Sequence, residues 1–275
     1  MIKPIEAECI SKTGDEIGNC DALVITGSYI AVIDAYQARG WRSWGNHLPG
    51  GVFARTVLVE AIEKLAPGLE RDEVFTMLHE ALQKAAADSM EEMEDADSIF
   101  AFPMARVMIY SVDKRQIWRL GDSPFCIDGE LNQPRNEALE AAALYRASVL
   151  TRFLAKERDL YDLVNSDIGR SAIIQTIAQE DQKADGVTAI SGNPNAKLED
   201  ILAHVETYDV NVDQEIIMAT DGFPRILPTL DESTDWLLEE KSRDPLFIND
   251  YKALRNWGEY DAGYDDRTYV RFIVE

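Results

Sequence analysis

The segment Asp21-Ala-Leu-Val-Ile-Thr-Gly-Ser-Tyr-Ile-Ala-Val-Ile-Asp34 decides how the first half of the chain folds. Two β-rich runs lie on either side of Gly27-Ser28, and this pattern predicts a hairpin with a two-residue turn and glycine at its first position. In such a hairpin, residues equally distant from the turn face each other across the ladder. Asp21 and Asp34 are therefore predicted to lie opposite each other at its open end.

The two opposed carboxylates have a chemical consequence. Like charges directly opposite each other destabilise a hairpin. A divalent cation between them relieves the repulsion, and Mg²⁺ and Mn²⁺ favour the hard oxygen ligands that aspartate supplies. The open end of this hairpin is therefore a candidate metal site.

The composition favours a folded domain in a reducing compartment. The chain has 275 residues, of which 46% are hydrophobic, so it can bury a sizeable core and lies near the upper size of one domain. Its three cysteines form neither a disulfide framework nor a metal-ligand spacing. The N-terminus lacks the layout of a signal peptide, and no apolar stretch is long enough to span a bilayer. We therefore expect a cytoplasmic protein.

The formal net charge of −23 argues against nucleic acid and anionic membrane surfaces as partners. Solubility is the simplest meaning of this charge. A second meaning applies if the chain holds a cation site, because an acidic protein then needs its metal to attract an anionic substrate. Composition alone leaves both open.

The order of the segments predicts one α+β domain over residues 1–275. Strand patterns alternate with amphipathic helical patterns, and sequential hairpins favour antiparallel sheets covered by helices. The expected strands lie at 5–12, 22–34, 105–112, 116–120, 125–127, 215–220 and 268–274. The expected helical segments lie at about 52–65, 71–94, 136–183 and 234–257, with loops at 35–49 and 186–194.

Further aspartates occur where apolar strands end. Asp122 follows Ile-Trp-Arg-Leu-Gly, Asp221 follows Ile-Ile-Met-Ala-Thr, and the pair Asp265-Asp266 leads into the last strand. Each of them alone is explained by the frequent use of Asp in turns. Taken as a set with Asp21 and Asp34, they indicate several carboxylates at one end of a sandwich.

These aspartates lie in short motifs that resemble those of the metal-dependent type 2C (PPM-type) serine/threonine protein phosphatases. The family motifs read Asn-Glu-Asp-Ala, Val-Phe-Asp-Gly-x-Gly-Gly, Asn-x-Gly-Asp-Ser, Ala-(Ser/Thr)-Asp-Gly and Asp-Asn-x-Thr. In the same order, the chain shows Gly18-Asn-Cys-Asp-Ala22, Ala31-Val-Ile-Asp34, Gly50-Gly51-Val-Phe-Ala54, Trp118-Arg-Leu-Gly-Asp-Ser123, Met218-Ala-Thr-Asp-Gly222 and Tyr264-Asp-Asp-Arg-Thr268.

The resemblance implies a four-layer α-β-β-α sandwich of two antiparallel sheets flanked by helix pairs. It implies two Mn²⁺ or Mg²⁺ ions in a cleft between the sheets, with a looser third ion in some members. Hydroxide bound to the binuclear centre would attack phosphorus in line, with Asp34 and Asp221 as the main catalytic carboxylates. The implied metal ligands are Asp21, Asp34, Ala35 through its carbonyl, Asp122 for the third ion, Asp221 and Asp265.

The chain departs from the family pattern at several of these positions. Ala35 replaces the glycine after the bridging aspartate, and Cys20 replaces the glutamate that reaches a metal through water. The basic residue that grips phosphate in some members is missing from its usual place. Lys12 lies further upstream and is one candidate to replace it. Arg39 and Arg42 are alternative candidates, although a solvated loop explains both equally well. A helical insert at about 136–195 occupies the place of the family's flap.

Two hypotheses follow from the sequence. The first is a metal-dependent phosphomonoesterase that dephosphorylates phospho-Ser or phospho-Thr in proteins. The alternative is a catalytically inactive, phosphatase-like module that binds or regulates another protein, which the changes at Ala35 and Cys20 favour. A small acidic metal-binding protein unrelated to phosphatases requires the motif order to be accidental.

Overall fold

The computed structural model describes residues 4–36, 43–91, 102–156 and 158–275. Its organising element is the hairpin of β2 (Asp21–Ile25) and β3 (Tyr29–Tyr36), in which Asp21 pairs with Asp34 as predicted. The turn differs in detail from the expectation, since Gly27 is not in the left-handed region. The Thr26 hydroxyl closes the turn instead, accepting from the backbone N–H of Ser28 at 3.2 Å and of Tyr29 at 3.0 Å.

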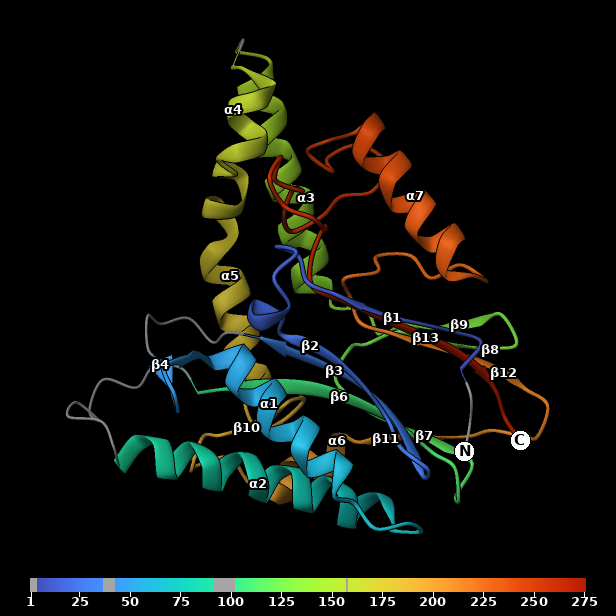
Figure 1. Cartoon of the computed structure of the whole chain (residues 1–275). Helices are drawn as coiled ribbons and strands as arrows, with labels where there is room; N and C mark the ends of the chain where they lie inside the picture. Colours follow the sequence, from blue (N-terminus) through green and yellow to red (C-terminus); the bar gives the residue numbers. More distant parts are fainter. Residues whose placement is uncertain (1–3, 37–42, 92–101, 157) are drawn as a thin grey trace.

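Two antiparallel sheets form the centre of the molecule (Figure 1). The five-stranded sheet has the order β1 (Glu6–Ile10), β13 (Arg267–Ile273), β12 (Glu215–Ala219), β8 (Phe125–Ile127), β9 (Glu130–Asn132). The six-stranded sheet has the order β11 (Glu206–Asp209), β7 (Gln116–Leu120), β6 (Met104–Ser111), β3, β2, with β10 (Ile190–Ser191) paired to β6. A small separate hairpin joins β4 (Ser43–Trp44) to β5 (Leu48–Pro49).

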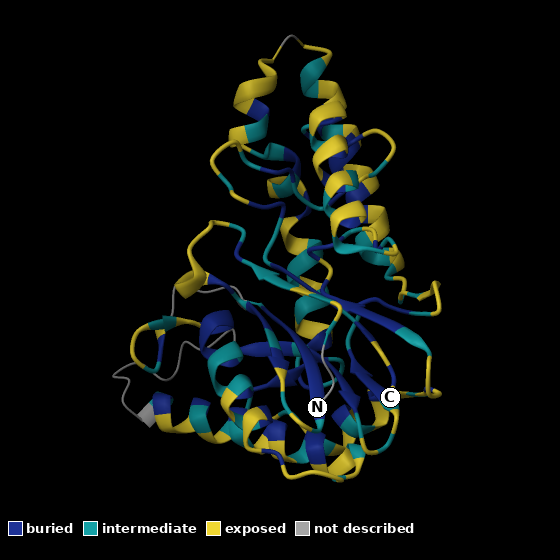
Figure 2. Ribbon diagram, turned by 45° about the vertical axis from the view of Figure 1, so that its right-hand side comes forward, coloured by how far each residue is buried: buried dark blue, intermediate teal, exposed yellow. Residues whose placement is uncertain are grey.

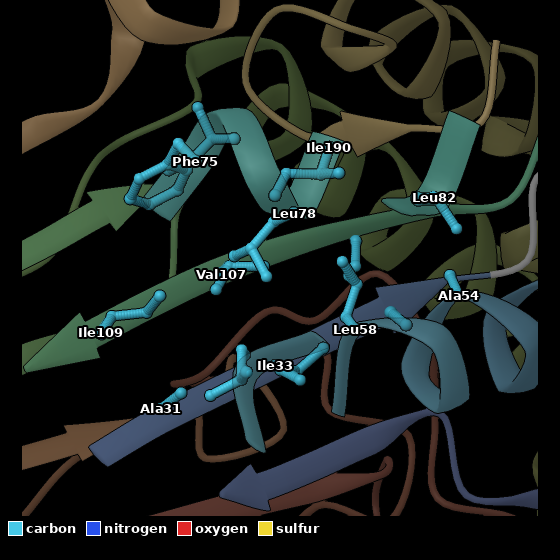
Figure 3. Packing of buried hydrophobic residues seen from close by; sticks show 14 of the residues in the cluster. Ala31, Ile33, Ala54, Leu58, Phe75, Leu78, Leu82, Val107, Ile109 and Ile190 are labelled. Atoms are coloured by element: carbon cyan, nitrogen blue, oxygen red, sulfur yellow. The ribbon is translucent and has the colours of Figure 1, made fainter. Parts of the chain in front are cut away.

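One helix pair covers the outer face of the six-stranded sheet. The helices α1 (Gly50–Glu63) and α2 (Arg71–Glu91) place their apolar stripes on alternate residues of β3 and β6, as Figure 3 shows for Leu58, Leu78 and Val107. The period of two in a strand sends the remaining residues of β3 and β6 to the opposite face.

That opposite face forms a second core between the two sheets. It is built from Ile30, Val32, Met108, Tyr110, Ile117, Phe125, Ile216, Met218, Val270 and Phe272, all buried. Figure 2 shows the strands of both sheets as largely buried ribbon. A sheet that is apolar on both faces must be covered on both, which gives the layered sandwich.

The remaining long helices lie on the other side of the sheets from α1 and α2 (Figure 1). The helices α3 (Glu137–Leu154) and α5 (Ile168–Ala184) pack against each other, and α4 (Leu160–Asn165) lies between them in sequence. The helix α7 (Leu230–Arg243) follows β12 in the chain. The mixed α+β class and the antiparallel sandwich flanked by helices are thereby confirmed. None of the helices in the described ranges is long and apolar enough to cross a membrane.

Some predicted boundaries were wrong. The helical pattern expected over 234–257 ends at Arg243, because Asp244 precedes Pro245 and its carboxylate accepts from the backbone N–H of Ile248 and Asn249, both at 2.7 Å. The sequence analysis also missed α6 (Leu198–His204), β11 and a 3₁₀ turn, η1 (Glu16–Gly18).

Candidate functional site

The candidate site lies where the inner faces of the two sheets change from apolar to polar. On β3, Ile30 and Val32 point into the core between the sheets, and Asp34 is the next residue on that face. Four other segments also change from apolar to polar residues on their inner faces at this end. The polar residues are Asp21 on β2, Arg106 on β6, Thr220 after β12 and Thr268 on β13. One end of the sandwich therefore gathers polar side chains from both sheets.

Asp21 joins the two sheets at this end. Its Oδ2 accepts a hydrogen bond from Thr220 Oγ1 at 2.6 Å and a longer one from Thr268 Oγ1 at 3.4 Å. Thr268 N in turn donates to Thr220 Oγ1 at 2.9 Å. Asp21 is only 3% exposed, so the stabilisation of its negative charge depends on these hydroxyl groups and on any neighbouring cation rather than on water.

The buried carboxylates have raised pKa values. Burial is the main cause for Asp21, whose pKa lies well above its ordinary value, and the charge of Asp34 adds to it. Burial also raises the pKa of Asp34 to about 6, although Arg106 opposes the shift. Asp221 lines the cavity described below, and desolvation by the surrounding protein, followed by the charge of Asp34, raises its pKa well above the usual range. Repelling carboxylates of this kind are stabilised by a cation.

Arg106 supplies one such cation from within the chain. It pairs with Asp34 in the β3–β6 register, and its Nη1 lies 3.2 Å from Asp34 Oδ2 while its Nε lies 3.0 Å from Asp122 Oδ1. The guanidinium also stacks on the Tyr36 ring, 4.7 Å from the ring centre. Gly121, at φ +111°, leaves room for it, because a Cβ there would lie 2.6 Å from Arg106 Cγ.

The loops after β12 and before β13 bring Asp221 beside Asp265 and Asp266. Gly222 permits this approach, since a Cβ at that position would lie 2.0 Å from the Asp266 carbonyl oxygen. Asp265 forms an ion pair with Arg255. Asp266 has a structural role, because its two carboxylate oxygens accept from the backbone N–H groups of Lys12 at 2.7 Å and Cys20 at 2.8 Å.

These groups line a cavity of about 1050 Å³. The implied metal ligands all contribute to its wall: Asp21, Asp34, Ala35, Asp122, Asp221 and Asp265. Ala35 sits in the extended backbone of β3, where alanine replaces glycine without strain. The candidate phosphate clamps Arg39 and Arg42 lie outside the described residues.

The chemistry and charge of these carboxylates suit a divalent cation, but their side chains are not arranged as a complete coordination sphere. Hard oxygen donors from Asp21, Asp34 and Asp221 share one cavity. After burial, the charge of Asp34 is the next cause that raises the pKa of both Asp21 and Asp221. Across the described ranges, however, no three or more Cys, His, Asp or Glu side chains are arranged as a metal site. Arg106 instead pairs with Asp34 and Asp122, and Arg255 pairs with Asp265.

Four residues of the site escaped the sequence analysis: Thr220, Thr268, Arg106 and Arg255. The two threonines were present in the motifs that were compared, but their hydrogen bonds to Asp21 require both sheets. The signal for Arg106 was a charged residue inside an apolar strand, on the face opposite Ala105 and Val107. Arg255 comes from irregular chain and gave no signal.

No protein-family model matches the sequence, and no curated protein matches it. Solved structures do match. The serine/threonine phosphatase PstP/Ppp of Mycobacterium tuberculosis is 16% identical over 98% of each chain, with a TM-score of 0.51. The PPM Ser-Thr phosphatase MsPP of Mycobacterium smegmatis, solved with cacodylate, is 16% identical over 99% of this chain and 100% of its own, with a TM-score of 0.44. The phosphatase Stp1 of Staphylococcus aureus is 10% identical over 100% and 96% of the two chains, with a TM-score of 0.47. At such identity, the match to PstP/Ppp shows a shared fold.

Proposed function

We propose, from the premise that this chain has the fold of the PPM-type serine/threonine phosphatases, that it is a metal-dependent phosphomonoesterase. The observation that carries the proposal is the opposed pair Asp21 and Asp34, buried at the rim of the sandwich with Asp221 in the same cavity. Three acidic side chains whose pKa values are raised together are costly in a fold unless a ligand uses them.

Asp21, Asp34, Asp221 and Asp265 would hold two Mn²⁺ or Mg²⁺ ions. The carbonyl of Ala35 would complete the set, and Asp122 with Asp221 would hold a third ion. Divalent ions in such a site supply the positive charge that activates water and stabilises the phosphoryl oxygens. The chain's own part is to orient these carboxylates, which Thr220 and Thr268 do for Asp21.

A thiol nucleophile is disfavoured by the same structure. Burial, followed by the charge of Asp266, raises the pKa of Cys20 to about 12, so its thiol stays protonated beside the acidic cluster. Burial raises the pKa of Cys126 to about 11 and also raises that of Cys9. Hydrolysis by water directed at phosphorus therefore suits these residues better than a covalent cysteine intermediate. The three free thiols support a cytoplasmic location.

The substrate that suits the cavity is a phosphorylated Ser or Thr in a protein. A volume of about 1050 Å³ exceeds what a free phosphate needs and accommodates a side chain with its neighbours. Part of the wall comes from Leu139 on α3 and from Ile174 and Ile177 on α5. The helical insert would therefore act as a flap-like element that selects the substrate.

A specific observation favours the alternative of an inactive binding or regulatory module. Arg106 already neutralises Asp34 and Asp122, and Arg255 already neutralises Asp265. A cavity that balances its own carboxylates with arginine side chains has less need of metal. Such a module would bind a regulatory partner or phosphoprotein without turning it over.

Hydrolysis of para-nitrophenyl phosphate separates the two. The assay compares the wild type with Asp34→Asn and Asp221→Asn, each with Mn²⁺, Mg²⁺ or EDTA, and circular dichroism verifies the fold. The phosphatase predicts turnover that needs metal and is lost in both variants. The binding module predicts no turnover by the folded wild type with any of the ions.

A further inference from the structure

Three cations gather at one side of the cavity in a protein whose net charge is −23. Lys12, Arg170 and Arg255 each line both the main cavity and a neighbouring cavity of about 270 Å³, so they form the wall between the two. They come from the N-terminal segment after β1, from α5 of the helical insert, and from the irregular chain before β13. We call them the basic triad.

The basic triad is held in place by a hydrogen-bond network centred on Asp167. This carboxylate caps α5 by accepting from Arg170 N at 2.8 Å, and it accepts from Asn256 N at 3.2 Å. It also pairs with the fully buried Arg146, which lies 2.8 Å away and donates to the carbonyls of Leu246 and Ala253. The insert and the segment that carries Arg255 are thus fixed to each other.

Each side chain of the triad is partly anchored and partly open. Arg170 Nη1 donates to the Leu254 carbonyl at 3.2 Å, and Lys12 Nζ lies 3.4 Å from Asp261 Oδ2. Arg255 pairs with Asp265, and the side chains of Lys12 and Arg255 are 22% and 23% exposed. All three residues line the two cavities, so the donors that these contacts leave over are available to an anion there.

Arg255 lies close enough to both Lys12 and Arg170 for its charge to oppose theirs. Burial lowers the pKa of both Lys12 and Arg170, and in each case the positive charge of Arg255 is the next cause. Clustered cations that are half withdrawn from water are stabilised by an anion between them. Arginine forks and a lysine point charge match the oxygens of a phosphate dianion.

We propose that Lys12, Arg170 and Arg255 form the phosphate-binding site of this protein, an inference that takes the identity of the anion from the proposed phosphatase function. The contact between Arg255 and Asp265 places a phosphate held here next to the carboxylates that would hold the metal ions. The site takes the place of the N-terminal basic residue that the motif comparison found missing. Lys12 was a candidate for that place from the sequence, whereas Arg170 and Arg255 were not, and all three lie outside the compared motifs.

Calorimetric titration without metal tests the site separately from catalysis. Inorganic phosphate, a phosphothreonine peptide and the same peptide without phosphate are titrated in EDTA at constant low ionic strength. The proteins are the wild type, Lys12→Gln and Arg170→Gln. The matched control is Arg135→Gln, which removes a cation from the rim of the same cavity, where Arg135 is 77% exposed and paired with Glu140. Thermal unfolding verifies that each variant is folded.

The site predicts saturable binding of phosphate and of the phosphopeptide by the wild type, about tenfold weaker in both triad variants and within about twofold of wild type in the control. Binding of phosphate but not of the phosphopeptide identifies the site as one for the free product and overturns the substrate role. Equal affinity in all four proteins, or no saturable binding by the wild type, overturns the site itself.

Measurement of phosphopeptide turnover with Mn²⁺ in the same proteins distinguishes failure of this inference from failure of the phosphatase proposal. If phosphate binds through the triad and no turnover occurs with Mn²⁺, the hydrolase proposal fails while the binding site stands. If turnover occurs and the KM of the phosphopeptide is unchanged in Lys12→Gln and Arg170→Gln, the binding site fails while the hydrolase stands.

Discussion

Arg106 and Asp34 lie opposite each other on neighbouring strands, with Arg106 Nη1 3.2 Å from Asp34 Oδ2. The same guanidinium contacts Asp122, so one arginine joins two carboxylates that the phosphatase motifs assign to metal ions. Arg106 therefore supplies part of the positive charge that balances the carboxylates at this end of the sandwich. Any metal that binds here competes with an intramolecular cation.

Replacement of Arg106 by methionine is expected to tighten the binding of Mn²⁺. The change frees Asp34 and Asp122 while it keeps most of the apolar side-chain volume, so the metal no longer competes with the guanidinium. We expect a Kd for Mn²⁺ about tenfold lower by calorimetry, and a metal-free protein less stable by about 2 kcal/mol. Arg271→Met is the control, since Arg271 pairs with Glu6 and Glu215. An unchanged or weaker affinity for Mn²⁺ would show that Arg106 does not compete.

Gly121→Ala should act on the same ion pairs through the backbone. Alanine at φ +111° is strained, and its Cβ would lie 2.6 Å from Arg106 Cγ, so the guanidinium must move away from Asp122. A loss of about 2–4 kcal/mol in the free energy of unfolding is expected in urea. Gly27→Ala is the control, because no atom lies within 4 Å of its added Cβ. Equal stability of the two variants would contradict the tight fit around Arg106.

The metal-free protein should be more stable at pH 5 than at pH 7.5. The pKa of Asp34 is raised by burial to about 6, so the folded state retains a proton that the unfolded state loses at lower pH. The contribution of Asp34 to the free energy of unfolding is therefore fully present below the pKa of the unfolded state. It is lost as the pH rises through the folded-state pKa of about 6, and the total loss is roughly 2–3 kcal/mol. The pKa values of Asp21 and Asp221 are raised mainly by burial, and they act in the same direction.

Thermal unfolding in EDTA across this pH range measures the effect. Asp34→Asn should flatten the dependence, and so should Mn²⁺ added to the wild type, because each removes an unbalanced negative charge. Asp113→Asn, at an exposed turn position, reports the background from the acidic surface. A wild type and an Asp34→Asn variant with the same pH profile would be inconsistent with a buried carboxylate cluster.

The helical insert should depend on Arg146 for its attachment. This fully buried arginine pairs with Asp167 and donates to backbone carbonyls at Leu246 and Ala253. Arg146→Met leaves these acceptors unpaired, so we expect a loss of about 3–5 kcal/mol in urea unfolding. Arg152→Met on the exposed face of the same helix should change stability by less than about 1 kcal/mol. A small effect of Arg146→Met would mean that the insert is held in another way.

The fold was predictable from the sequence where local pattern settles geometry. A two-residue turn fixes the pairing of Asp21 with Asp34, and strands ending in Asp-Gly or Gly-Asp mark the rim of the sheets. Pro245 carried a signal for the break of the last helix at Asp244, but the sequence analysis extended the helical pattern to residue 257. The apolar residues after Pro245 pack as irregular chain instead.

The cations of the site were not predictable in the same way. Arg106 meets Asp34 only in the register of β3 with β6, two strands that are distant in sequence. Arg255 and Arg170 come together because Arg146 and Asp167 tie the insert to the segment after α7, and no local pattern encodes that contact. Charge balance in a cavity is a tertiary property, so sequence motifs found the carboxylates and missed their partners.

The most direct measurement is phosphate release from a phosphothreonine peptide as the Mn²⁺ concentration is raised, for the wild type, Asp34→Asn and the control Asp113→Asn. We predict saturable, Mn²⁺-dependent release by the wild type and the control, and a loss of at least about a hundredfold in Asp34→Asn while its fold is retained. Equal release by Asp34→Asn, or none by the folded wild type at any Mn²⁺ concentration, would contradict a phosphatase built on these carboxylates.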